Sequence, residues 1–168
     1  MTRVEVAKMY KVLEDCKTMK NKKGEGVIVT KGLIKAIVKN KALLKDDFDI
    51  IIDAEKNYTE FLKVFNTKRG DIVNKYCVKD DSGNPVLINS SFYKFESIEK
   101  ETLCNKELEK ELKEDTEKLY KIEKEYLDLQ KEVSDVKIED LVKITEDDIP
   151  EEGNSEALEV LYSLVKED

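Results

Sequence analysis

The sequence predicts a mainly α-helical fold with a small β element: a long antiparallel, coiled-coil-like helical hairpin with a β-hairpin tip, plus N-terminal helices and a docked C-terminal helix. Three observations predict this fold. Apolar residues recur at steps of three and four along two long segments, as on helices that pack face to face. Between them, residues 76–96 follow a period of two and contain Gly83 and Pro85. A last apolar run near the C-terminus is too short to form a stable helix alone.

Residues 1–45 are expected to form an N-terminal helical base. Thr2 and Glu5 have the spacing of a capping box, which predicts a helix start. This helix should end in "KNKKGEG", where Asn and Gly disfavour helix. Thr30 is a suitable N-cap for a second helix with the sequence "KGLIKAIVKNKALL". The base is therefore expected to contain two helices.

Residues 46–134 are expected to form the hairpin, with one helix over 46–76 and the returning helix over 105–133. Each helix carries an apolar seam whose polar members are Glu55, Arg69 and Asp115. One interpretation is that these polar residues fix the register of the two helices, with an Arg69–Asp115 ion pair. The other is that they line a groove for a ligand. Because such a pair leaves apolar seam exposed, a homo-oligomer is expected.

The β tip lies at 76–96 within this hairpin. Its "DDSGNP" segment is rich in turn residues, and "PVLIN" and "FYKF" read as strands that can pair with "YCVK". The tip either only reverses the chain, or it also meets a partner. In the second case the contact is edge pairing of strands or the aromatic side chains of Phe92, Tyr93 and Phe95.

Residues 135–168 form an acidic tail. The β-branched segment "VSDVKIEDLVKI" predicts a short strand, and "TEDDIPEEGNS" predicts a loop. Ser155 is the expected N-cap of a last helix, which should dock on the N-terminal helices. The three regions are expected to form one folding unit.

The charge pattern limits the choice of partner. Of the 30 basic residues only Arg3 and Arg69 are Arg, so sequence-specific nucleic-acid binding, which relies on bidentate Arg, is not expected. The first 45 residues carry a net charge of +8 and the rest −16. The acidic part is either a solvated surface or one that meets a basic partner, as a nucleic-acid mimic would. The segment "KKGEG" is either an ordinary loop or an anion site, for which the candidates are Lys20, Lys22, Lys23 and Lys31.

The sequence does not predict an enzyme, a metal site or a cofactor. It has no His, and it lacks the glycine motifs that bind phosphates. Cys16, Cys77 and Cys104 have no metal-binding spacing and are expected to be buried structural thiols. The acidic run "DDFDIIID" could hold a hard cation, but Asp near a helix start is common. No run of about 20 apolar residues and no signal-peptide pattern is present, which predicts a cytoplasmic protein that does not bind membranes.

The order of these segments resembles that of uncharacterised small phage and prophage proteins. The resemblance is carried by "IKAIVKNKALL", the long helix, "KDDSGNPV", an aromatic strand, an acidic helix, "EDDIP" and a short apolar helix. It implies a mobile genetic element in a bacterial cytoplasm, and it assigns no catalytic residues to this sequence. The helical hairpin around a β element also resembles prefoldin in architecture. We therefore expect a non-enzymatic protein that blocks a host factor, such as an anti-phage defence component, or that assists assembly. The alternative is an oligomer that sequesters a nucleotide signal.

Overall fold

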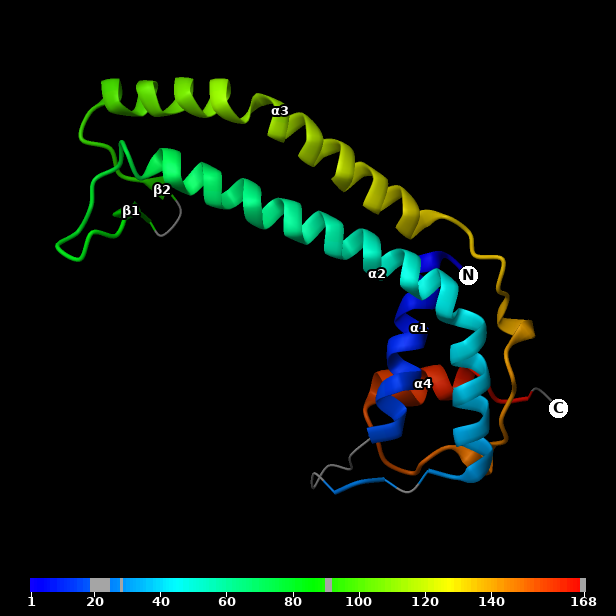
Figure 1. Cartoon of the computed structure of the whole chain (residues 1–168). Coiled ribbons are helices and arrows are strands. Elements are labelled where there is room, and N and C mark those ends of the chain that lie inside the picture. Colours follow the sequence, from blue (N-terminus) through cyan, green and yellow to red (C-terminus); the bar gives the residue numbers. More distant parts are fainter. Residues whose placement is uncertain (19–24, 28, 90–91, 167–168) are drawn as a thin grey trace. The chain divides into compact units, whose positions relative to one another are not determined.

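The computed structural model confirms a mainly α fold with a small β element (Figure 1), and it describes residues 1–18, 25–27, 29–89 and 92–166. The described residues form four α-helices and two strands: α1 (Arg3–Asp15), α2 (Lys31–Val73), β1 (Leu87–Ile88), β2 (Phe92–Tyr93), α3 (Ile98–Lys131) and α4 (Ser155–Ser163). Short 3₁₀ turns lie at Cys16–Thr18, Ile138–Asp140 and Glu146–Asp148. The chain divides into two compact units. Unit 1 comprises Met1–Ala54 and Tyr126–Asp168, and unit 2 comprises Glu55–Glu125.

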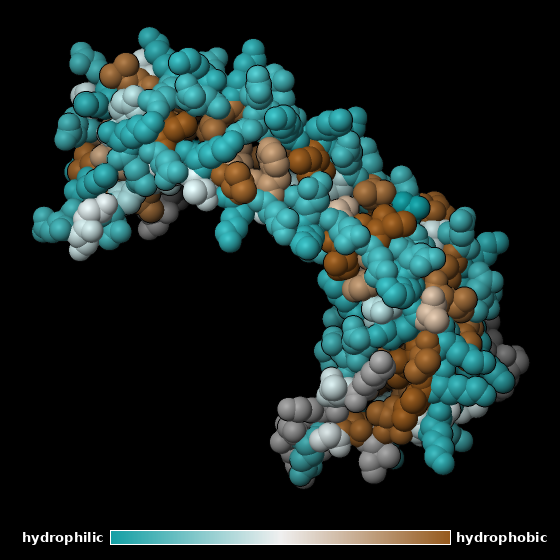
Figure 2. Space-filling model, in the orientation of Figure 1, coloured by the Kyte–Doolittle hydropathy of each residue, from teal (hydrophilic) through white to brown (hydrophobic). Residues whose placement is uncertain are grey.

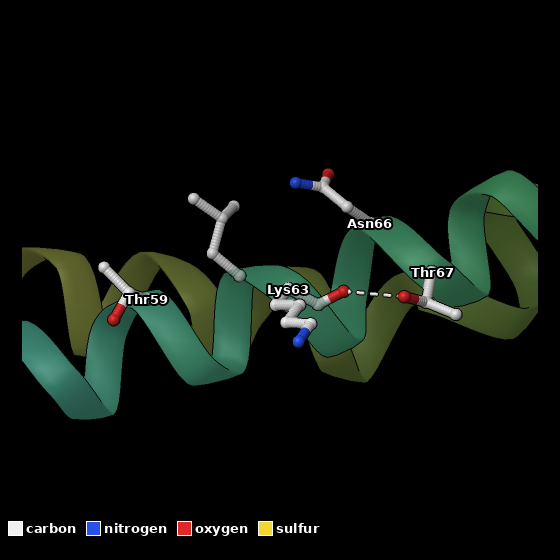
Figure 3. A pocket seen from close by; sticks show the side chains of 5 residues that line it. Thr59, Lys63, Asn66 and Thr67 are labelled. Carbon is white, nitrogen blue, oxygen red and sulfur yellow. Dashed lines mark hydrogen bonds between the residues drawn. The ribbon is translucent and has the colours of Figure 1, made fainter.

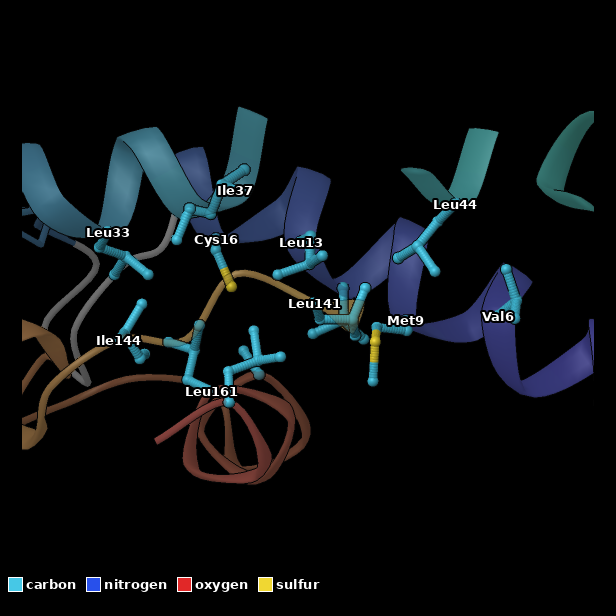
Figure 4. Close-up of a cluster of buried hydrophobic side chains, with 14 residues drawn as sticks. Val6, Met9, Leu13, Cys16, Leu33, Ile37, Leu44, Leu141, Ile144 and Leu161 are labelled. Atoms are coloured by element: carbon cyan, nitrogen blue, oxygen red, sulfur yellow. The ribbon is translucent and has the colours of Figure 1, made fainter. Parts of the chain in front are cut away.

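Unit 1 has a hydrophobic core built from α1, the first part of α2, the segment after α3, and α4 (Figure 4). The predicted capping box starts α1: the Thr2 hydroxyl accepts from the Glu5 N–H, and the Thr2 N–H donates to the Glu5 carboxylate at 2.8 Å. Leu161 of α4 is fully buried in this core together with Leu13 of α1 and Leu33 of α2. The expected docking of the C-terminal helix on the N-terminal helices is confirmed.

Helix α2 corrects the prediction of two helices separated near residue 45, because it runs without a break from Lys31 to Val73. The expected N-cap is confirmed, since the Leu33 N–H donates to the Thr30 hydroxyl at 3.0 Å. The physical reason for continuity is that no Gly or Pro occurs between Gly32 and Gly70. An ion pair between Lys45 and Asp49, one helical turn apart, also spans the expected break.

The acidic tail contains no strand among its described residues, contrary to prediction. The segment after α3 forms a 3₁₀ turn at Ile138–Asp140 and makes two isolated bridges, Val133 to Thr2 and Ile144 to Val165. Val142 bonds instead to a side chain, because Asn40 of α2 accepts from its N–H and donates to its carbonyl. The helix that follows is capped by Asn154 rather than Ser155, since the Asn154 side chain accepts from the Glu156 N–H.

Unit 2 is an antiparallel pair formed by the second part of α2 and the first part of α3. Three contacts set the register, made by α2 and by Tyr76 just after its end, and along them the residue number rises on this side as it falls on α3. They are Tyr58 to Glu123 at 3.4 Å, Lys68 to Asp115 at 2.6 Å and Tyr76 to Glu107 at 2.5 Å. The predicted pairing of the two seams within this unit is therefore confirmed.

The polar seam residues lie differently from the expected register pair. Asp115 pairs with Lys68 rather than with Arg69, which is exposed and has no ion pair with any described residue. Glu55 is half-buried on α2. The side chain of Asp115 is only 16 % exposed, and a Lys at the flank of the seam can reach it with its charged end while its stem covers apolar surface. The ion pair is thus made across the flank of the helical interface.

Candidate protein-binding site at the β tip

Three short segments at the end of unit 2 close into a ring of backbone hydrogen bonds. The Val78 N–H donates to the Lys94 carbonyl at 2.8 Å, the Lys94 N–H to the Val86 carbonyl at 2.9 Å, and the Val86 N–H to the Val78 carbonyl at 2.8 Å. Each segment therefore pairs with both of the others. At this level the ring has no open edge that could accept another strand, which argues against partner binding by edge pairing.

The turn between the first two segments is held by Asp80. Its carboxylate accepts from the backbone N–H groups of Ser82 at 2.9 Å and Asn84 at 2.8 Å, and its carbonyl accepts from the Gly83 N–H. Gly83 has a φ of 81°, in the left-handed region that a residue with a Cβ disfavours. Pro85 begins the next segment, where its missing N–H costs nothing. The sequence "DDSGNP" thus forms the tight turn that was predicted.

The aromatic residues of the tip separate into two groups. Tyr93 and Phe95 pack against a buried cluster made by Ile72, Val73, Cys104 and Leu112 of α2 and α3. Phe92 instead has 71 % of its surface exposed. Successive residues of a strand point to opposite faces, so Tyr93 and Phe95 share the inner face and Phe92 lies on the outer one. Of the three predicted binding residues, only Phe92 is available to a partner in this structure.

Ile88 lies directly across the β ladder from Phe92. Residues opposite each other in an antiparallel pair have their side chains on the same face, so Ile88 and Phe92 form one exposed apolar pair. Ile88 is 48 % exposed. Leu87 in the tip and Ile98 at the start of α3 are also exposed. Elsewhere, hydrophilic side chains cover most of the face shown in Figure 2, with apolar groups between them.

The tip is anchored to the helices by a polar cluster at its base. Glu107 of α3 accepts hydrogen bonds from Lys75 and from the Tyr76 hydroxyl, each at 2.5 Å. These bonds, that from Lys75 first, hold the pKa of Glu107 below its ordinary value. The same carboxylate raises the pKa of Tyr76, because the phenol must donate its proton to the bond. Hydrogen bonds therefore connect the base of the tip, which carries the exposed apolar pair, to α3.

The sequence also predicted an anion site formed by four lysines of the N-terminal region. Lys20, Lys22 and Lys23 lie outside the described residues, and Lys31 is exposed at the start of α2. A carboxylate of the chain itself already lies there: the Thr30 hydroxyl donates to Asp148 at 2.5 Å, and a Cβ on Gly32 would meet the Asp148 carboxylate at 2.6 Å. The hydrogen bond from Thr30 is the main reason that the pKa of Asp148 is lowered. An added anion at this helix start would face a negatively charged neighbour.

Two hollows on the described surface are lined by ordinary surface side chains. One hollow on unit 2 is lined by residues of α2 alone, and its Thr67 hydroxyl donates to the Lys63 carbonyl of the same helix (Figure 3). A groove on unit 1 between the Ile138–Asp140 turn and the end of α4 carries two Lys and two Glu side chains. Within the described residues, no group of three His, Cys, Asp or Glu side chains could hold a metal ion. In the acidic run at 46–53, Asp47 accepts hydrogen bonds from Arg3 and Ser134.

The cysteines follow the expectation for structural thiols only in part. Cys16 and Cys104 are fully buried, whereas Cys77 is half-buried. Burial raises the pKa of Cys16 to about 11 and also raises that of Cys104. A thiol with a raised pKa is a poor nucleophile at neutral pH. These two residues therefore act as small core side chains.

Two residues that matter to unit 2 were missed in the sequence. Ile88 was not singled out, although its place across the turn from Phe92 could have suggested the pairing. Lys68 was overlooked because it lies one residue off the seam.

Comparison with protein-family models, with curated proteins and with solved structures finds no match to this chain. None of the helices in the described part combines the length and apolarity that crossing a bilayer requires.

Proposed function

We propose that this protein is a non-enzymatic binding protein that contacts another protein through the exposed side chains of its β tip. The observation that carries the proposal is the apolar pair of Phe92, 71 % exposed, and Ile88, 48 % exposed, on one face of the β ladder. A large aromatic side chain on a supported backbone is the kind of residue that supplies most of the binding energy in protein interfaces.

The closed ring of the tip supports side-chain recognition over strand addition. The backbone groups of Val78, Val86 and Lys94 are already paired with one another, so they are not open to a partner strand. The partner should therefore offer an apolar pocket that receives Phe92. Such a contact is small, and binding through it would gain from the rigid support below, because little conformational entropy is lost on association.

The resemblance to phage proteins also suggests in which cell the protein acts and on what kind of partner. We infer a bacterial host cell in which the protein blocks a host factor, such as an anti-phage defence component, or assists assembly. The acidic surface of the chain would favour a partner with a basic surface around the pocket.

A capture experiment with a matched control tests the proposal. The full chain and the Phe92→Ala and Tyr120→Ala variants are used as bait in lysate of the bacterial host, and stoichiometric partners are quantified by mass spectrometry. Tyr120 lies on α3 and is 69 % exposed, so its loss removes a comparable aromatic away from the tip. Phe92→Ala should reduce capture at least about tenfold, as expected for a residue worth more than about 1.4 kcal/mol in binding, and Tyr120→Ala should not.

Circular dichroism of each variant verifies that the fold is kept. Equal capture by all three baits would overturn the assignment of the tip as the binding surface. The absence of any stoichiometric partner would count against a protein-binding function altogether.

A further inference from the structure

The outer face of α2 in unit 1 carries a stripe of charges divided by sign. Seven exposed residues lie within a band about 80° wide at 100° per residue: Lys31, Lys35, Lys39, Ala42, Asp46, Asp49 and Asp53. We call this set the α2 stripe. Its first half is basic, its second half is acidic, and its middle residue is the small Ala42. The stripe lies opposite the buried face of the helix, which contains Leu33, Ile37 and Leu44.

The order of these charges is unfavourable for the helix by itself. Basic residues at a helix start oppose the helix dipole, and Lys31, Lys35 and Lys39 are like charges spaced four residues apart. None of the three lysines has a carboxylate three or four residues away on the helix, and none makes an ion pair with a described residue. Within the stripe, only Asp49 is paired, with Lys45. The stripe therefore has unused charge of both signs.

A stripe that is basic in one half and acidic in the other is complementary to itself when reversed. If two copies of α2 pack antiparallel with their Ala42 residues at the two-fold axis, Lys39 of each copy lies within one residue, about 1.5 Å along the axis, of the level of Asp46 of the other. By the same register Lys31 lies level with Asp53, and Lys35 with Asp49. A two-fold interface of this kind uses the same surface on both copies. The small side chain of Ala42 allows the helices to approach closely at the axis.

Apolar side chains border the stripe on both sides. Ile34 and Val38 are 49 % and 55 % exposed along one border, and Leu43 and Ile50 are 46 % and 38 % exposed along the other. Leu43 is next to Ala42, so in the antiparallel arrangement the two Leu43 side chains meet near the axis. The stripe thus has an arrangement common in coiled-coil interfaces, where apolar contacts supply affinity and flanking charges set orientation.

We propose that the α2 stripe is a homodimer interface in which two copies of the chain pack antiparallel about Ala42. The stripe is about 33 Å long, at 1.5 Å per residue. It is one helix face, smaller than the 20 to 30 residues per side of a standard interface. The dimer should therefore form at micromolar concentrations, and it should weaken as salt screens the ion pairs. The interface is separate from the β tip and does not depend on the proposed function.

The test is a charge exchange measured by sedimentation equilibrium of the full chain. One variant carries Lys31→Glu and Lys39→Glu, and a second carries Asp46→Lys and Asp53→Lys. All four positions are exposed, so circular dichroism should remain that of the native chain. Each variant alone should raise the dimer dissociation constant at least about tenfold, because like charges then face each other. An equimolar mixture of the two variants should form heterodimers, because complementary charges then face each other.

A third variant addresses the axis without changing a charge pair. Ala42→Gln places a longer side chain at the centre and should weaken the dimer, whereas Asn57→Gln, an exposed change on the same helix outside the stripe, should not. A wild-type chain that stays monomeric up to about 1 mM would overturn the proposal. So would a dimer that both charge variants retain unchanged, or variants that fail to associate when mixed.

Discussion

Asn40 offers the sharpest test of how unit 1 is held together. This residue is fully buried on α2, and its side-chain amide bonds to both backbone groups of Val142, at 2.6 Å to the N–H and 3.0 Å to the carbonyl. In Asn40→Leu, a side chain of similar size fills the space, but both backbone groups lose their partner. Leaving a buried donor or acceptor unsatisfied costs about 1–3 kcal/mol. For two such groups we expect unit 1 to lose about 2–6 kcal/mol of unfolding free energy.

Urea unfolding of the full chain, followed by circular dichroism, measures this loss. With a urea dependence of about 1–3 kcal/mol per molar, the midpoint of the transition that includes unit 1 should fall by at least about 0.7 M. Asn57→Leu is the control, since Asn57 is exposed on the same helix and has little to lose. A loss below about 1 kcal/mol, or one equal to that of the control, would refute the view that Asn40 replaces a strand partner for Val142.

Two further predictions concern Gly32 in unit 1 and the cysteines of both units. Gly32→Ala should destabilise the chain in thermal melts, because its Cβ would lie 2.6 Å from the Asp148 carboxylate. In an Asp148→Ala background the same change should stabilise it by up to about 1 kcal/mol, the helix preference of Ala over Gly, and the same sign in both backgrounds would contradict this. In native protein, iodoacetamide should label the half-buried Cys77 first, with Cys16 and Cys104 labelled only after urea is added. Peptide mass spectrometry checks this order, and equal labelling rates would show that the two thiols are not buried.

The parts of the fold that the sequence predicts correctly are those with local causes. The capping box of Thr2 and Glu5, the N-cap of Thr30 and the turn around Gly83 each depend on residues a few positions apart. The break expected near residue 45 was wrong because it rested on the start of a regular apolar seam after that point, and no helix-breaking residue occurs there.

The parts that could not be predicted depend on contacts between distant segments. Nothing near Val142 in the sequence indicates that its backbone bonds to Asn40, so its β-branched neighbourhood was interpreted as a strand. A clue was available in Asn40 itself, since a polar residue at a core-facing position of a helix usually has a specific buried partner. The partner of Asp115 was misassigned for a related reason. A residue beside the seam, such as Lys68, can form the ion pair that fixes the register, and the apolar periodicity does not identify such a residue.

The β tip shows how one missing fact changes a functional interpretation. The order "FYKF" alternates, so two of its aromatic residues must share a face, but the sequence does not say which face is covered. The pairing of Cys77 with Phe95 places this face on the helices, and Tyr93 and Phe95 then belong to the core of unit 2. Changing either of them would disturb the tip as well as any binding. Phe92 is the one aromatic of the three whose role in binding can be separated from its role in folding.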